Sequence, residues 1–180
     1  MSGARQVKVL FDERAIAERN QALAVEIAAA KPKDLLVVAV LKGSFMFAAD
    51  LIRALYRVGL EPHVEFIHLS SYMEGMLSLG TVRILKDIES SVRDRDVLLV
   101  DDILESGRTL AFAKDLLVAR GARRVMVCTM LEKPGKRAVQ ISADFVGFTS
   151  PDVFVVGYGM DVAHSYRELP FIGHVVMDGD

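Results

Sequence analysis

The sequence is poor in cysteine and in long apolar runs, and both absences narrow the class of protein. Its one cysteine, Cys128, cannot form an intramolecular disulfide and lies within the largely apolar residues 125–131, which indicates a core residue in a reducing compartment. The longest purely apolar run, residues 35–41, is far shorter than the roughly 20 residues of a membrane span. Because the amino-terminal residues also lack the apolar core of a signal peptide, we expect a cytoplasmic protein with no membrane partner.

An excess of basic charge is also missing. The chain has 22 Lys+Arg against 24 Asp+Glu, a net charge of −2 and a pI of about 6.1, whereas nucleic-acid-binding domains usually carry a basic excess. Its 180 residues are 52% hydrophobic with a mean hydropathy of +0.31, which is typical of one globular domain with a large core. No repeat, low-complexity tract or linker divides the sequence. We therefore expect a single domain over residues 1–180 and no nucleic-acid partner.

Hydrophobic periodicity predicts helices that alternate with strands. Helices are expected at residues 12–30, with Asp12 as the N-cap, at 45–58 and at 109–120. Strands are expected at the apolar or β-branched segments 35–41, 63–70, 81–85, 97–100, 124–131, 145–148, 154–157 and 174–177. This alternation predicts an α/β fold with right-handed crossovers and a mainly parallel central sheet flanked by helices.

One segment, VLLVDDILESGRTL at residues 97–110, combines a strand end with groups that suit a phosphorylated sugar. The paired acids Asp101 and Asp102 repel phosphate but suit sugar hydroxyls or the water shell of Mg²⁺. The turn that follows offers a flexible glycine, two hydroxyls and the free N–H groups of a helix start, which together suit an anion. A diol on one side and a phosphate on the other describe a ribose 5-phosphate.

This segment closely resembles the phosphoribosyl-pyrophosphate signature of the type I phosphoribosyltransferases. The segments LKGS, SSY and LEKPGKR and the stretch from residue 144 to 169 resemble successive elements of the hypoxanthine(-guanine) phosphoribosyltransferases, in order and spacing. The resemblance implies the type I fold, with a small hood region built from the amino- and carboxyl-terminal segments, a lid loop at about residues 70–80, and a homodimer or homotetramer. It also implies a purine-salvage enzyme that uses Mg²⁺. Such an enzyme moves the 5-phosphoribosyl group from phosphoribosyl pyrophosphate to N9 of hypoxanthine or guanine, giving IMP or GMP and pyrophosphate.

The resemblance also implies which residues hold the donor. Asp101 and Asp102 would bind the ribose diol and, through water or ribose, the metal. The phosphoribosyl group would further contact Glu105, Ser106, Gly107, Arg108 and Thr109. The pyrophosphate would be bound by Lys42, Gly43, Ser71, Tyr72 and Arg167. In this family the loop that holds the pyrophosphate contains an unusual cis peptide, so we expect a non-proline cis bond between Leu41 and Lys42.

The purine would lie against four further residues. Lys133 would donate to the 6-oxo group, which favours hypoxanthine or guanine over adenine because the adenine amino group is itself a donor. Phe154 would stack on the base, and the backbone of Val155 would bond to the purine edge. Asp161 would lie beside the base and bind a second Mg²⁺. The sequence leaves open the preference among hypoxanthine, guanine and xanthine.

Position 105 departs from the family pattern, in which the general base is ordinarily an aspartate. Glu105 keeps the carboxylate, but its side chain is longer by one methylene, on the order of 1.5 Å, and a misplacement of about 1 Å can cost roughly 10²-fold in rate. Either the loop is reset to compensate, or the enzyme is slow. If glutamate abolishes catalysis, the alternative function is a phosphoribosyltransferase-fold ligand sensor or regulator.

A response-regulator receiver domain is a rival from another class, because it also begins a helix after a strand that ends in paired acids. It requires a phospho-acceptor aspartate after the next strand, where this chain has Leu131, Glu132 and Lys133. Dinucleotide-binding and P-loop domains are disfavoured because neither glycine motif, G-x-G-x-x-G or G-x-x-x-x-G-K-[ST], occurs.

Overall fold

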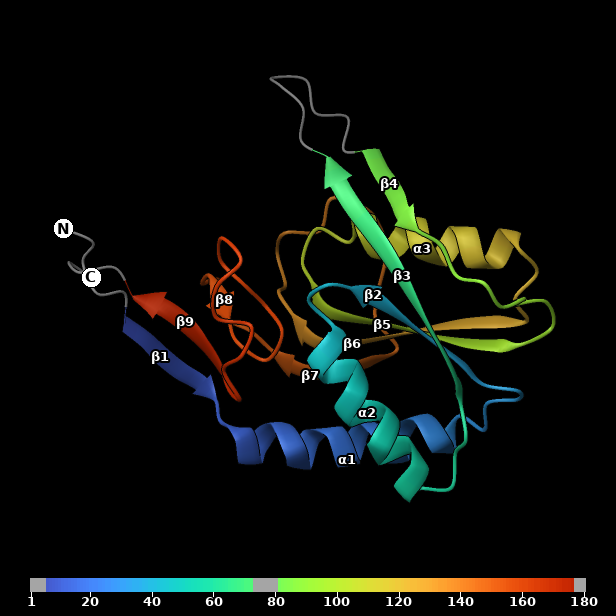
Figure 1. Ribbon diagram of the computed structural model, residues 1–180, viewed down its shortest axis with the longest axis horizontal. Helices are drawn as coiled ribbons and strands as arrows, with labels where there is room; N and C mark the ends of the chain where they lie inside the picture. Colours follow the sequence, from blue (N-terminus) through green and yellow to red (C-terminus); the bar gives the residue numbers. More distant parts are fainter. Residues whose placement is uncertain (1–5, 73–80, 177–180) are drawn as a thin grey trace.

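The computed structural model describes residues 6–72 and 81–176, which form a large sheet and a small one (Figure 1). The large sheet has six strands in the order β4-β3-β2-β5-β6-β7. Neighbouring strands are parallel except for the antiparallel pair of β3 and β4. Their bounds are β2 Leu36–Leu41, β3 His63–Tyr72, β4 Thr81–Lys86, β5 Asp96–Leu104, β6 Arg124–Glu132 and β7 Phe145–Thr149. The predicted α/β fold with a mainly parallel sheet is confirmed.

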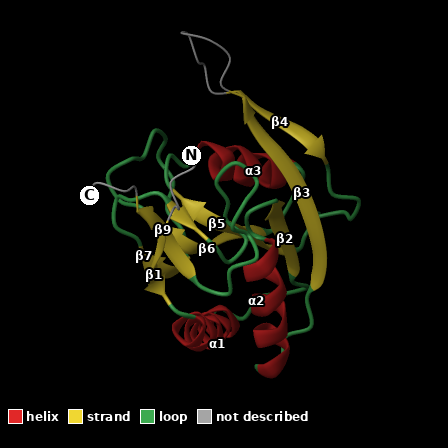
Figure 2. Cartoon of the chain, turned by 60° about the vertical axis from the view of Figure 1, so that its left-hand side comes forward, coloured by secondary structure: helices red, strands yellow, loops and turns green. Residues whose placement is uncertain are grey.

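Helices cover both faces of this sheet. Helices α1 (Glu13–Ala29) and α2 (Phe45–Arg57) pack on one face, and α3 (Arg108–Ala119) packs on the other (Figures 1 and 2). Successive residues of β5 consequently alternate between two cores: Leu98 packs with α1 and α2, and Leu99 packs with α3. Both are fully buried, which explains why the central strands are continuous apolar runs rather than alternating ones.

The small sheet was only partly foreseen. It contains β1 (Gln6–Phe11), β9 (Ile172–Val176) and β8 (Val155–Val156), all antiparallel, and joins the two ends of the described chain in the small hood region that the resemblance implied. No strand was expected at β1, because none of its residues is fully buried and its partner is far away in the sequence. The strand expected at residues 154–157 is only two residues long, and the last one begins at Ile172. Met177, expected to end it, lies outside the described residues.

Two strands run further than the sequence indicated. β5 was expected to stop at Val100, but it continues as far as Leu104 and pairs with β6 throughout. β3 likewise extends to Tyr72, and its last two residues pair with β4 instead of belonging to the lid loop. In both cases backbone pairing with a neighbour carries polar residues into a strand. The remaining lid residues, 73–80, lie outside the part of the chain that is described.

In the ranges 6–72 and 81–176, none of the helices combines the length and the apolar character needed to span a bilayer.

Asp12 caps α1 as expected, and this contact gives a test of the fold. Its Oδ1 accepts a hydrogen bond from the Ala15 N–H at 2.8 Å. Asp12→Ala should destabilise the protein by about 1 kcal/mol, which lowers the Tm of a domain of this size by roughly 2–4 °C in thermal unfolding. Asp12→Asn retains an acceptor oxygen and serves as the control. An unchanged Tm for the alanine variant would mean that the cap contributes nothing.

Candidate active site

The carboxyl ends of β2 and β5 meet at the centre of the large sheet. The chain leaves β2 towards α2 on one face and leaves β5 towards α3 on the other. In open α/β sheets, ligands bind in the crevice that opens where neighbouring connections diverge in this way. The predicted sugar acids lie near the end of β5, the predicted phosphate residues follow it, and Lys42 and Gly43 follow β2. The topology therefore brings these residues together.

The loop after β2 has the backbone that was expected of it. The Leu41–Lys42 peptide bond is cis and non-proline, as predicted. The Ser44 hydroxyl donates to the Val40 carbonyl at 2.5 Å and closes the loop at the start of α2. Sequence reasoning did not assign Ser44 a role, although a small hydroxyl residue between a glycine and a helix was a usable signal.

Gly43 lies directly against one of the paired acids. A Cβ atom at Gly43 would stand 1.8 Å from Oδ2 of Asp102, so no other residue fits without moving that carboxylate. The loop after β2 and the end of β5 are therefore in contact at Gly43, where any side chain would displace the Asp102 carboxylate.

The acidic pair is buried and electrostatically unfavourable in the free protein. Burial and the adjacent charge of Asp102 raise the pKa of Asp101 well above its ordinary value, and burial also raises the pKa of Asp102. Each carboxylate is oriented by the next backbone N–H: Asp102 N–H donates to Asp101 at 2.9 Å, and Ile103 N–H donates to Asp102 at 2.8 Å. The arrangement suits partners that carry hydroxyl donors or positive charge.

The turn into α3 lines a cavity beside the start of the helix. Gly107 has φ +80° at the N-cap of α3, and a Cβ there would lie 2.4 Å from Ile141. A cavity of about 330 Å³ opens above the helix start and is lined by Gly43, both acids, Glu105, Ser106, Gly107 and Thr109. Arg108 is exposed and does not line this cavity.

A second cavity, of about 480 Å³, contains the predicted purine residues. It is lined by Asp102, Glu105, Lys133, Phe154, Val155 and Asp161, among others. Asp102 and Glu105 line both cavities, so the two cavities lie next to each other. Phe154 is 59% exposed, which fits a stacking surface better than a core residue.

The Glu105 carboxylate lies between two lysines. Its Oε1 is 3.6 Å from Nζ of Lys133 and 3.7 Å from Nζ of Lys136, and Lys136 also pairs with Asp152 at 2.5 Å. The hydrogen bond to Asp152 raises the pKa of Lys136. Sequence reasoning missed Lys136, although it lies in the LEKPGKR segment that carried the resemblance.

Arg137, from the same segment, fixes the backbone next to Glu105. Its Nη1 donates to the carbonyls of Leu104, at 3.0 Å, and Glu105, at 2.7 Å, and its Nη2 pairs with Glu132. A single guanidinium thus holds the loop that carries the predicted base. Arg137 was also missed, because nothing local in the sequence connects it with a carbonyl 32 residues away.

Asp161 and Arg167 pair with each other in this structure. Their closest atoms are 2.8 Å apart, and Arg167 also donates to the Gly159 carbonyl at 2.7 Å. The other oxygen of Asp161 accepts from the His164 N–H at 2.7 Å. The roles predicted for these residues, in metal and pyrophosphate binding, therefore require that the pair separates. Lys42 is exposed at the loop after β2, and the side chains of Ser71 and Tyr72 lie outside what is described.

Comparison with known proteins identifies the family. A model of the phosphoribosyl transferase domain matches residues 6–163. The hypoxanthine phosphoribosyltransferase of Buchnera aphidicola subsp. Schizaphis graminum is 42% identical over 173 residues, which cover 94% of this chain and 96% of the relative. This chain belongs to the hypoxanthine phosphoribosyltransferase family. The Escherichia coli K12 hypoxanthine phosphoribosyltransferase is 45% identical over 144 residues, covering 80% of this chain and 79% of its own.

A solved structure supports the family at the level of the fold. A hypoxanthine-guanine phosphoribosyltransferase from Bacillus anthracis superposes with a TM-score of 0.88 at 42% identity, covering 95% of this chain and 100% of the other. The type I phosphoribosyltransferase fold predicted from the motifs is thus confirmed, which excludes the fold of a response-regulator receiver domain.

The burial of Asp101 should lower the stability of the folded protein, although the residue is proposed to bind the substrate. The pKa of Asp101 is raised in the folded state, so folding disfavours its charged form. The cost to the free energy of unfolding is absent below about pH 4, where the unfolded carboxyl is also protonated, and it grows as the pH rises. Asp101→Asn should therefore raise the Tm by roughly 2–4 °C at pH 8, with a smaller gain at pH 4.5. A Tm gain that does not change with pH would contradict this origin.

Proposed function

We propose that this chain catalyses transfer of the 5-phosphoribosyl group from phosphoribosyl pyrophosphate to N9 of hypoxanthine or guanine in purine salvage. The bond between ribose C1 and the pyrophosphate oxygen breaks, the bond from C1 to N9 forms, and IMP or GMP leaves with pyrophosphate. The carrying observation is the pair of adjacent cavities, one with acids and a helix start and the other with Lys133 and Phe154. Family membership supports the same reaction.

The donor would occupy the first cavity. Asp101 and Asp102 would accept hydrogen bonds from the ribose hydroxyls, and the N–H groups at the start of α3, with the hydroxyls of Ser106 and Thr109, would bind the 5-phosphate. As the bond at C1 breaks, positive charge develops on the sugar and the two carboxylates stabilise it. Lys42, Gly43 and Arg167 would bind the pyrophosphate, with Ser71 and Tyr72 covering it.

The residues present fit Mg²⁺. No cluster of three or more acidic, histidine or cysteine ligands occurs in residues 6–72 and 81–176, but Mg²⁺ is commonly bound by one or two carboxylates together with waters and substrate phosphates. Asp101 and Asp102 would hold one such ion through water or ribose, and Asp161 would hold a second once Arg167 has turned away. When bound, Mg²⁺ neutralises charge on the departing pyrophosphate.

Glu105 would act as the general base that accepts the purine N7 proton. Its carboxylate lines both cavities, so it lies where the sugar and the base meet. Arg137 donates to its backbone carbonyl, and Lys133 and Lys136 both approach its Oε1; these contacts would compensate for the extra methylene. This arrangement favours a working enzyme over a ligand sensor.

Purine selection would depend on Lys133. The side chain is 8% exposed, and its ammonium is 3.6 Å from Glu105, so its position is restricted before a base arrives. An ammonium has only donors and therefore bonds a 6-oxo group but not a 6-amino group. Phe154 would stack on the ring, and the backbone of Val155 would bond to the purine edge.

The chain would act as a single cytoplasmic domain in a homodimer or homotetramer. Cys128 is buried, and burial raises the pKa of its thiol, which makes it an unreactive core residue. Large apolar side chains remain partly exposed on α2 and on the adjacent β3, where Phe45, Val64 and Phe66 are 37–39% exposed. A second copy of the chain would cover this surface.

Glu105→Gln tests the proposed reaction. The variant keeps the size of the side chain but cannot accept a proton, so kcat for IMP formation should fall by roughly 10²–10⁴-fold, with little change in KM for the donor. The measurement is nucleotide formation from phosphoribosyl pyrophosphate, Mg²⁺ and hypoxanthine, with Glu105→Asp as the matched carboxylate control. Wild-type protein that binds the donor and forms no nucleotide from any purine would instead be a sensor.

Lys133→Met tests purine selection. Methionine fills a similar volume but cannot donate, so the KM for hypoxanthine and guanine should rise at least tenfold, the effect of losing a hydrogen bond from a charged group. Adenine should remain a poor substrate for both proteins. Lys33→Met, at an exposed lysine that lines neither cavity, is the control; equal KM values for wild type and Lys133→Met would exclude the assigned role.

A further inference from the structure

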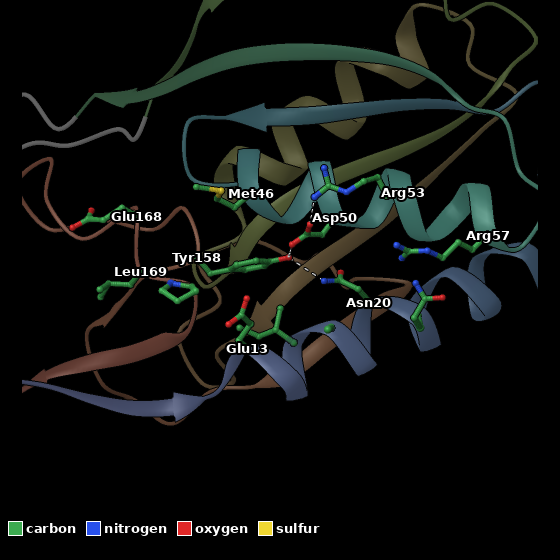
Figure 3. Close-up of a pocket in the computed structure, with 13 residues that line it drawn as sticks. Glu13, Asn20, Met46, Asp50, Arg53, Arg57, Tyr158, Glu168 and Leu169 are labelled. Carbon is green, nitrogen blue, oxygen red and sulfur yellow. Dashed lines mark hydrogen bonds and ion pairs between the residues drawn. The ribbon is translucent and has the colours of Figure 1, made fainter.

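A chain of hydrogen bonds beneath the active site ties the hood to both helices on one face of the sheet. The Tyr158 hydroxyl donates to Oδ2 of Asp50 on α2 at 2.6 Å and accepts from the Asn20 side-chain amide on α1 at 2.9 Å (Figure 3). The other oxygen of Asp50 pairs with Arg53. Tyr158 itself comes from the segment that follows β8, so one side chain joins three elements.

These hydrogen bonds, rather than tight packing alone, hold the ring. A cavity of about 660 Å³ lies beside it, between the two helices and the Leu169 region (Figure 3). Tyr158 is 6% exposed, and burial, followed by the bond to Asp50, raises its pKa well above the ordinary value, so the hydroxyl stays protonated and can donate. Without the hydroxyl, the ring has space in which to shift.

The residue after Tyr158 contacts the proposed pyrophosphate loop. Gly159 has φ +97°, and a Cβ there would be 2.4 Å from the carbonyl oxygen of Gly43. Gly159 is also bonded twice to Arg167: its N–H donates to the Arg167 carbonyl at 3.0 Å, and its own carbonyl accepts from the guanidinium at 2.7 Å. The position of Gly159 thus sets how Gly43 and Arg167 stand relative to each other.

We propose that Tyr158 is a positioning residue for pyrophosphate binding. The proposal rests on the function proposed above. The Asp50–Tyr158–Asn20 hydrogen bonds hold Gly159 against Gly43. That contact keeps the loop at the start of α2 and the Arg167 segment at the separation that binds a diphosphate. Asp50 lies on α2, which begins directly after the proposed pyrophosphate loop, so Asp50 and that loop belong to one rigid unit. Tyr158 itself touches no substrate.

Tyr158→Phe tests the proposal by direct binding. Isothermal titration with magnesium pyrophosphate should show a Kd about tenfold higher than for wild type, because loss of the buried hydrogen bond to a charged group leaves Gly159 seated against Gly43 in only about a tenth of the free molecules. Binding of ribose 5-phosphate, which uses the start of α3, should remain within twofold. In steady-state assays, KM for phosphoribosyl pyrophosphate should rise while KM for hypoxanthine stays within twofold. Asp50→Asn, which keeps an acceptor but loses the charge, should give an intermediate Kd.

Tyr56→Phe is the matched control, since Tyr56 lies on α2 and is 72% exposed. A purely structural role for Tyr158 would lower the Tm and the active fraction, and hence kcat, while leaving the Kd for pyrophosphate unchanged; that result would overturn the proposal. Equal weakening of pyrophosphate and ribose 5-phosphate would also overturn it. If wild-type protein forms no nucleotide from hypoxanthine, the proposed function fails. The pyrophosphate titration decides the role of Tyr158 in either case.

Discussion

Two carboxyl groups, Asp101 and Asp102, are buried side by side at the end of the central strand β5, and much of the surrounding structure follows from that constraint. Each is oriented by the N–H of the next residue, and Gly43 approaches so closely that only a glycine fits. Burial raises both pKa values, so two charged carboxylates cost free energy in the free protein at the place where the proposed donor binds. A buried charge without a partner is costly unless a ligand or metal supplies one. A bound ligand or metal would therefore stabilise this pair of carboxylates, which the free protein does not.

Close contacts continue outward from this pair. Asp102 meets Gly43, the carbonyl of Gly43 meets Gly159, and Gly159 follows Tyr158, whose hydroxyl is held by α1 and α2. At both glycines a side chain would push the neighbouring group away. The segment after β8 thus contacts the loop after β2 through backbone atoms, and that loop contacts the Asp102 side chain near the end of β5, so a change at one contact shifts the next.

The parts that sequence reasoning predicted are those encoded locally. The turn around Gly107 and the cap at Asp12 each depend on a few consecutive residues, and each is confirmed. The cis peptide between Leu41 and Lys42 was expected from the family resemblance, and it is also present. Strand β1 was missed because an exposed edge strand has no buried run, and its partner lies at the other end of the chain. The ion pair of Asp161 with Arg167 and the grip of Arg137 on Glu105 also depend on folding, since no spacing in the sequence encodes either contact.

Glu105 shows how a departure from the family pattern is absorbed by its surroundings. A longer carboxylate must be restrained at more points if it is to reach the same atom, because each added bond is another rotatable torsion. Here the backbone is fixed by Arg137, and the carboxylate stands between Lys133, which is nearly buried, and Lys136, which Asp152 holds from the far side. Two lysines from one short segment therefore flank the proposed base, and an arginine from the same segment holds its backbone. An aspartate at this position would withdraw from the two lysines, so in this chain the glutamate and the LEKPGKR segment act as one unit.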